Sequence, residues 1–301
     1  MTLPSIGWIG TGVMGLSMCK HLLEAGFALK VFNRSPQKAE SLKAKGAVIV
    51  PSARDAATDS DIVCLMVGYP SDVEDVVLNE QTGILAVMKP GSILCDFTTS
   101  KPSLAQRIFT EAQSRQIESM DAPVSGGDVG ARNAALTIMC GGTQATFDRL
   151  TSVFKVVGKT WTLMGGAGSG QHTKCVNQTV IAGGMIGLCE GLVYAAKSGL
   201  NVESVLQAIG GGAAGSFSMQ SYGPRMLKGD FEPGFYVKHF VKDLSIVAEE
   251  AKRMEMTLPG IDLALELYNK LCTEVEGGAE MGTQALIKVL ESMNGVKIVK
   301  E

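Results

Sequence analysis

The chain has 301 residues, of which 46% are hydrophobic and 19% are charged, and its formal net charge is −3 at pH 7. This length and composition predict a soluble globular protein with two domains rather than one. Because the sequence has no dense cluster of lysine and arginine, it lacks the electrostatic footprint of a protein that binds nucleic acid or an anionic membrane surface.

The seven cysteines are scattered and odd in number, and none are spaced as Cys-x-x-Cys, which argues against a disulfide framework and a zinc site. We therefore expect a reducing, cytoplasmic location and no bound metal. A strand pattern starts almost at the first residue, so we expect no signal or transit peptide. The most apolar later stretch, Val180 to Cys189, is short and rich in glycine, and we expect that it does not span a bilayer.

From Ile6 to about Leu163, short β-like apolar runs alternate with helical patterns. The predicted strands lie within residues 5–10, 28–32, 47–50, 61–67, 92–97, 117–122 and 135–142, with helical patterns at 14–25 and 36–45. This alternation predicts an α/β domain with a doubly wound parallel sheet and helices on both faces. A long apolar helix is predicted from about Gln171 to Ser198, and only helices follow it. We therefore predict a first domain over residues 1–166 and an all-α domain over residues 167–301.

Three glycines, Gly10, Gly12 and Gly15, stand between the first predicted strand and the first predicted helix. They match G-x-G-x-x-G in the strand–turn–helix context that gives this pattern its meaning. The first glycine permits a tight turn, the second lets the backbone approach a pyrophosphate, and the third permits close helix packing. The helix N-terminus favours the same anion through its N–H groups and dipole. The sequence therefore predicts a Rossmann dinucleotide site. The other residues expected to contact the cofactor in this loop are Thr11, Val13 and Met14.

The second predicted strand ends in "VFNRSPQK", which carries Asn33, Arg34 and Ser35 where NAD-binding chains have an acidic residue for the ribose 2′-hydroxyl. A guanidinium and a hydroxyl suit a phosphate instead. We therefore predict NADP(H) in preference to NAD(H). The alternative is a solvent-facing arginine in an ordinary turn.

The stretch "DAPVSGGDVG" follows a predicted strand and contains Ser125, Gly126 and Gly127. A hydroxyl and unobstructed backbone N–H groups at such a turn suit a carboxylate. An ordinary Ser-Gly-Gly turn is the alternative.

The long helix opens with "GSGQHTKCVNQ", in which Lys174 and Asn177 are spaced i and i+3 and therefore share a face. A lysine on a largely apolar helix is partly desolvated and can exchange protons near neutral pH. A solvated surface lysine is the alternative. His172 is one of three widely separated histidines, so we interpret it as a polar residue at the helix start.

The stretch "FEPGFYVKHFVKDL" places Phe235, His239, Lys242 and Asp243 at helical spacing. Taken alone, it predicts a helix with an aromatic core side and a charged solvent side.

Four of these stretches resemble the β-hydroxyacid dehydrogenase family, in this order and over nearly the whole chain: "GWIGTGVMG", "DAPVSGG", "GSGQHTKCVNQ" and "KDL" at Lys242 to Leu244. That family includes 3-hydroxyisobutyrate dehydrogenase, tartronate semialdehyde reductase and the glyoxylate/succinic semialdehyde reductases. The resemblance implies hydride transfer between a nicotinamide cofactor and a small carboxylate that bears a hydroxyl or aldehyde group. It also implies a Rossmann domain, a long interdomain helix, an all-α domain and assembly into a homodimer or homotetramer.

The same resemblance assigns roles to single residues. Lys174 becomes the general acid/base, Asn177 helps to place the substrate, and Ser125, Gly126 and Gly127 hold its carboxylate. Thr99 contacts the cofactor near the nicotinamide, Lys242 reaches the cofactor, and Phe235 and Asp243 close the site.

Two positions depart from the family pattern. Gln178 stands where many relatives have a second asparagine, and Tyr69 follows Gly68 where relatives often have Leu-Pro. We expect these changes to affect the substrate-side geometry and the nicotinamide pocket.

Two other functions compete with the dehydrogenase interpretation. A non-catalytic dinucleotide-binding assembly module is the alternative from another class, and the presence of Lys174 argues against it. A decarboxylating dehydrogenase of the 6-phosphogluconate type needs a larger C-terminal domain than this chain provides.

Overall fold

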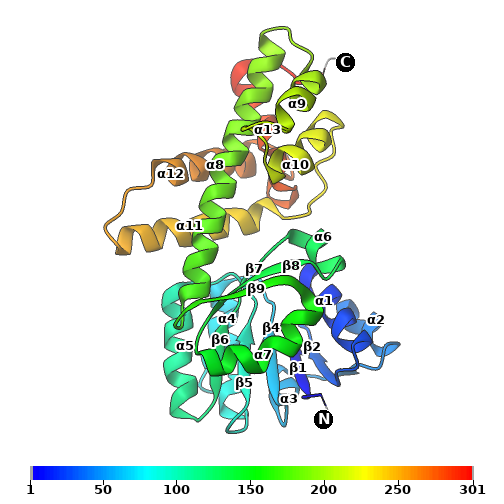
Figure 1. The fold of residues 1–301 in the computed structure, drawn as a ribbon, viewed down its shortest axis with the longest axis vertical. Coiled ribbons are helices and arrows are strands. Elements are labelled where there is room, and N and C mark those ends of the chain that lie inside the picture. Colours follow the sequence, from blue (N-terminus) through cyan, green and yellow to red (C-terminus); the bar gives the residue numbers. More distant parts are fainter. Residues whose placement is uncertain (1–2, 300–301) are drawn as a thin grey trace. The chain divides into compact units, whose positions relative to one another are not determined.

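The computed structural model describes residues 3–299, which belong to two compact units, Met1–Lys174 and Cys175–Glu301 (Figure 1). The predicted α/β architecture, long helix and all-α second part are confirmed. The first unit has two hydrophobic cores and the second unit has one. The change from strand–helix alternation to helices only therefore corresponds to a change of fold along the chain.

The first unit is built on a nine-stranded sheet in the order β3-β2-β1-β4-β5-β6-β8-β7, with β9 paired to β8. Strands β1 to β6 are all parallel, as expected, whereas β8 runs antiparallel to β6 and to β7. The strands are β1 Ile6–Ile9, β2 Leu29–Phe32, β3 Val48–Ile49, β4 Ile62–Leu65, β5 Ile93–Asp96, β6 Glu118–Asp121, β7 Val124–Ser125, β8 Leu136–Gly141 and β9 Gly158–Gly165.

All seven predicted strands are present, but β7 and β9 are additional. Strand β7 has only two residues, too few for a periodic pattern. Strand β9 lies beyond β8 and is mostly exposed, so it lacks the continuous apolar run of a buried parallel strand.

Helices cover both faces of this sheet, because the buried side chains of its strands divide between two separate cores. In β4, Cys64 packs in the core that also holds α1 and α7, whereas Val63 and Leu65 pack against α3, α4 and α5. Such alternation is expected of strands whose successive side chains point to opposite faces. The helices of this unit are α1 Val13–Glu24, α2 Glu40–Lys43, α3 Ala53–Ala57, α4 Pro70–Leu78, α5 Pro102–Ser114, α6 Gly127–Arg132 and α7 Gln144–Val157, with 3-10 turns η1 Pro36–Ala39 and η2 Ile84–Ala86.

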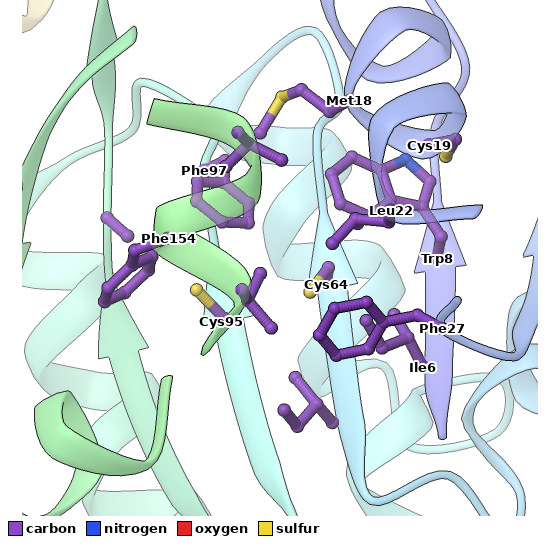
Figure 2. Packing of buried hydrophobic residues seen from close by; sticks show 14 of the residues in the cluster. Ile6, Trp8, Met18, Cys19, Leu22, Phe27, Cys64, Cys95, Phe97 and Phe154 are labelled. Carbon is purple, nitrogen blue, oxygen red and sulfur yellow. The ribbon is translucent and has the colours of Figure 1, made fainter. Parts of the chain in front are cut away.

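Aromatic rings lie in the core that holds α1 and α7 (Figure 2). The ring of Trp8 stacks on Phe97 with centroids 5.9 Å apart, and Phe97 meets Phe154 edge to face at 6.2 Å. Trp8 also donates an indole hydrogen bond of 2.7 Å to the carbonyl of Gly10. Core packing therefore fixes the backbone at the start of the glycine loop.

Helix α8, Ser169–Lys197, begins in the first unit and continues into the second. By length and composition it is apolar enough to cross a membrane. However, Ala182, Met185, Cys189 and Leu192 are buried in the core of the second unit, which makes α8 a core helix there. The remaining elements of this unit are α9 Val202–Gly210, α10 Phe217–Leu227, α11 Val237–Arg253, α12 Pro259–Glu274, η3 Gly278–Glu280, η4 Thr283–Ala285 and α13 Leu286–Asn294.

Candidate functional site

The glycine loop between β1 and α1 has the geometry that its spacing predicts. Gly10 has φ +100, and a Cβ there would overlap the carbonyl oxygen of Met66. A Cβ on Gly15 would overlap the carbonyl oxygen of Gly10, so the first turn of α1 packs directly on the loop. At Gly12, by contrast, a Cβ would meet no heavy atom within 4 Å. The loop therefore presents open backbone at its centre and is closely packed on both sides.

This loop fits the diphosphate of a dinucleotide. Helix α1 starts after Gly12 without a side-chain cap or an acidic residue in its first turn, so its N–H groups and dipole remain suited to an anion. The hydroxyl oxygen of Thr11 is buried and finds no hydrogen-bond partner among residues 3–299. A polar ligand atom at this position would satisfy it, since buried polar groups are costly when unpaired.

The residues after β2 lie beside the same loop. The Asn33 side chain accepts a 2.9 Å hydrogen bond from the Thr11 N–H and donates one of 2.9 Å to the Ser35 carbonyl. The Arg34 side chain is 83% exposed and forms an ion pair of 3.2 Å with Asp72. A guanidinium thus projects into solvent next to the loop, where an anionic ligand can reach it.

Lys174 is buried rather than solvated, with 7% of its surface exposed. Its Nζ donates a 2.8 Å hydrogen bond to the carbonyl of Val124, the residue before Ser125. The backbone then turns through Gly126 at φ +126 and Gly127 at φ +59, values that favour glycine. The structure therefore brings the predicted acid/base and the predicted carboxylate loop together in the first unit.

Asp121 was not singled out from the sequence, yet it organises this region. Its carboxylate accepts 2.8 Å hydrogen bonds from the N–H groups of Gly168 and Gln171, at the start of α8. A Cβ on Gly141 or Gly170 would lie against this carboxylate, so glycines make room for it. Burial raises the pKa of Asp121 to about 6, although the backbone hydrogen bonds oppose the rise. An acidic residue at the end of a strand, with glycines before a long helix, was the signal available in the sequence.

Gln171 is a second residue that the sequence did not single out. Its side-chain amide donates to the carbonyl of Thr98 at 2.8 Å and accepts from the N–H of Ser100 at 2.9 Å. These two bonds hold both neighbours of half-buried Thr99, the residue expected near the nicotinamide. The first turn of α8 is thereby tied to the loop after β5.

Tyr69 stands at the start of α4 with an exposed ring, and its N–H donates a 3.0 Å hydrogen bond to Asp72. Because Asp72 also pairs with Arg34, the loop after β4 is linked to the end of β2. No group of three or more His, Cys, Asp or Glu side chains that could hold a metal ion occurs within the described part of the chain.

The predicted residues of the second unit meet where α8 and α11 pack. Asn177 donates to Gln178 at 2.7 Å, Gln178 donates to Asp243 at 2.7 Å, and Asp243 forms an ion pair of 2.8 Å with Lys242. Phe235 is half-buried and packs edge to face on Phe240, with centroids 5.9 Å apart. The assigned roles of these residues remain predictions.

Two family models together match most of the chain. Residues 5–166 match the NAD-binding domain of 6-phosphogluconate dehydrogenase, and residues 168–290 match the NAD-binding domain of NADP-dependent 3-hydroxyisobutyrate dehydrogenase.

Individual relatives extend over nearly full length. The chain is 50% identical over 293 residues to a probable 3-hydroxyisobutyrate dehydrogenase-like protein of Arabidopsis thaliana named as mitochondrial, covering 97% of this chain and 87% of that one. It is 36% identical to 2-hydroxy-3-oxopropionate reductase of Escherichia coli, covering 97% and 99%. A solved structure of Mycobacterium tuberculosis 3-hydroxyisobutyrate dehydrogenase with L-serine is similar with a TM-score of 0.87 at 28% identity, covering 96% and 99%.

Proposed function

Since the chain belongs to the β-hydroxyacid dehydrogenase family of NAD(P)-dependent, 3-hydroxyisobutyrate dehydrogenase-like enzymes, we propose that it transfers a hydride between NADP(H) and a small β-hydroxy acid or its semialdehyde. Lys174 is the general acid/base of this proposed reaction. Members of this family are dehydrogenases and reductases that act on CH–OH groups. The observation that carries the proposal is the burial of Lys174 with its Nζ 2.8 Å from the carbonyl of Val124, next to the Ser-Gly-Gly loop.

The proton is moved by the lysine. In reduction, protonated Lys174 donates to the substrate oxygen as that oxygen becomes alkoxide-like, and in oxidation the neutral amine takes the proton back. The hydrogen bond to Val124 orients Nζ at the Ser-Gly-Gly loop. A nicotinamide, when bound, supplies or accepts the hydride.

Positioning of the substrate is assigned to the last residue of β7 and the turn that follows it. Ser125 and the N–H groups of Gly126 and Gly127 hold the carboxylate, and Asn177 helps to orient the molecule. A fixed orientation of the reacting carbon contributes a large part of the rate in reactions of this kind. The half-buried Ser125 and the two glycines at positive φ support this assignment.

The preference for NADP(H) is assigned to Arg34 with Asn33 and Ser35. Arg34 is exposed beside the glycine loop, and the described end of β2 carries no carboxylate that would bind a ribose 2′-hydroxyl. A guanidinium pairs well with a 2′-phosphate.

Assembly and location complete the proposal. Val176, Val180 and Tyr194 expose apolar side chains along α8, which supports a homodimer or homotetramer formed through the second unit. Light scattering coupled to size-exclusion chromatography measures this directly. The chain is a soluble protein, and we assign it to the cytoplasm.

The function is tested by following nicotinamide absorbance of the purified protein. For reduction, the enzyme is assayed with NADPH or NADH and with glyoxylate, succinic semialdehyde, methylmalonate semialdehyde or tartronate semialdehyde. For oxidation, it is assayed with 3-hydroxyisobutyrate, L-serine or threonate. We expect NADPH-dependent turnover that Lys174→Ala abolishes. The matched control is Lys197→Ala, because Lys197 lies on the same helix and also donates to a backbone carbonyl, that of Asn294 at 3.0 Å.

Two results would count against the proposal. Retention of nearly full activity by Lys174→Ala would remove the lysine from the mechanism. Tight NADPH binding without turnover of any acid would favour the non-catalytic dinucleotide-binding module.

A further inference from the structure

Four polar side chains of the second unit form one continuous chain of contacts between α8 and α11. It runs from the Asn177 amide to the Gln178 side chain at 2.7 Å, and from there to the Asp243 carboxylate at 2.7 Å. The other carboxylate oxygen of Asp243 lies 2.8 Å from Nζ of Lys242. The two ends are therefore the residue expected to place the substrate and the residue expected to reach the cofactor.

The middle of this chain is closed to solvent, whereas its ends are more open. Gln178 and Asp243 are each 2% exposed in the second unit, while Asn177 and Lys242 are partly exposed. One oxygen of Asp243 accepts from Gln178, and the other lies 2.8 Å from Nζ of Lys242 in an ion pair but accepts no hydrogen bond among the described residues. Its burial and its hydrogen bond to Gln178 favour a role for Asp243 behind the site, whereas the family resemblance has Asp243 close the site.

The hydrogen bond between Gln178 and Asp243 depends on the length of the Gln178 side chain. An asparagine at this position is one methylene shorter, and a hydrogen bond of 2.7 Å does not survive a retreat of about 1.5 Å, because bonds beyond roughly 3.5 Å are lost. The departure from the family pattern thus coincides with the contact that joins α8 to α11.

We propose that Gln178 and Asp243 are positioning residues that couple the substrate-side amide of Asn177 to the cofactor-side ammonium of Lys242. This inference rests on the proposed function, which supplies the roles of the two ends. Because the middle of the link is buried, and two hydrogen bonds and an ion pair make it continuous, displacement of one end shifts the other. Binding at one end then changes affinity at the other by the same factor, as linkage requires.

The test is a reciprocal exchange of one methylene. Gln178→Asn shortens one partner, Asp243→Glu lengthens the other, and the double variant restores the summed length across the gap. The dissociation constant of NADPH is measured by nicotinamide fluorescence, and kcat and KM are measured with 3-hydroxyisobutyrate and NADP+. Each single variant is expected to weaken NADPH binding and raise KM by about 10- to 100-fold, the range for a lost hydrogen bond to a charged group. The double variant is expected to recover most of the NADPH affinity.

A control variant separates positioning from general destabilisation. Glu250 is also a buried carboxylate of α11, and it pairs with Arg253 at 2.7 Å. Glu250→Gln is expected to lower the unfolding midpoint without changing the NADPH dissociation constant.

Three outcomes overturn the inference. One is single variants that bind NADPH as the wild type does, and another is a double variant that recovers stability but not NADPH affinity. The third concerns a replacement pair, used if the Asp243→Glu variant does not fold. Gln178→Glu with Asp243→Asn exchanges the two side-chain groups without added volume. The inference fails if this double variant binds NADPH no better than Gln178→Glu alone. Failure of the proposed function is distinct, because it shows as an active Lys174→Ala or as a wild type that binds no NADPH.

Discussion

Replacement of Asp121 by asparagine should change how the stability of the first unit depends on pH. The carboxylate is buried at the start of α8, where it accepts hydrogen bonds from Gly168 and Gln171. An unfolded chain releases this proton near pH 3.8, whereas burial raises the pKa of the folded carboxyl to about 6. Because one pH unit is worth about 1.4 kcal/mol per group, this gap corresponds to about 3 kcal/mol of unfolding free energy.

The sign follows from which state holds the proton. Between pH 3.8 and about 6 the folded protein keeps a proton that the unfolded chain has lost, so the pKa difference stabilises the fold below this window. The contribution disappears as the pH rises through 6. Relative to Asp121→Asn, which does not titrate, the wild type should therefore lose about 3 kcal/mol between pH 4 and pH 7. The lost hydrogen-bond acceptor adds an offset that does not depend on pH.

Tryptophan fluorescence is a suitable assay, because the only two tryptophans, Trp8 and Trp161, lie in the first unit. Urea unfolding curves at half-unit steps of pH give the free-energy difference between the two forms. Asp61→Asn is the flat control. Hydrogen bonds from Lys89 and Ser5 lower the pKa of Asp61 to about 2, so the stability that this carboxylate contributes is lost only below about pH 4, and the difference from the wild type should not change between pH 4 and pH 7. A difference between wild type and Asp121→Asn that stays flat from pH 4 to pH 7, or that grows in favour of the wild type, would refute the reasoning.

Three further changes have defined outcomes. Lys174→Ala should lower kcat by about 10²–10⁴-fold, the range for a lost general acid/base, with the NADPH dissociation constant little changed. Arg34→Ala should raise KM for NADPH by about 10- to 100-fold through loss of a charge-assisted hydrogen bond, while KM for NADH changes little; equal losses for both cofactors would place Arg34 away from the 2′-phosphate. Gly15→Ala should destabilise the first unit by about 1–3 kcal/mol or more, because the added Cβ overlaps the Gly10 carbonyl. Thermal unfolding with and without NADPH measures both the loss of stability and the stabilisation by the cofactor.

The elements that could be predicted are those with strong local signals. The buried parallel strand β4 is a continuous apolar run, and the glycine loop has a spacing tied to its backbone geometry. Strand β9 escaped prediction because its mostly exposed residues carry no such run.

The environment of single side chains was harder to predict than their positions. Whether Lys174 faces solvent depends on the carbonyl of Val124, 50 residues earlier in the chain, and no local pattern encodes that contact. The same holds for Asp243, whose partner Gln178 lies 65 residues away. Helical spacing placed both residues on the correct elements, but only the tertiary structure shows that both are buried.

The side-chain amide of Gln171 makes two hydrogen bonds of the kind that the backbone of a neighbouring strand would make. It donates to the carbonyl of Thr98 and accepts from the N–H of Ser100. These bonds join residues more than 70 positions apart, and they form only when the first turn of α8 has docked. A polypeptide released after residue 166 lacks this turn, together with the N–H groups that satisfy Asp121. The Rossmann part is therefore not complete at its last strand, because it needs the first residues of α8 for hydrogen bonds to its own loops. Gene fusions or truncations that respect the sheet but cut before Gly168 should leave the loop around Thr99 open to proteases.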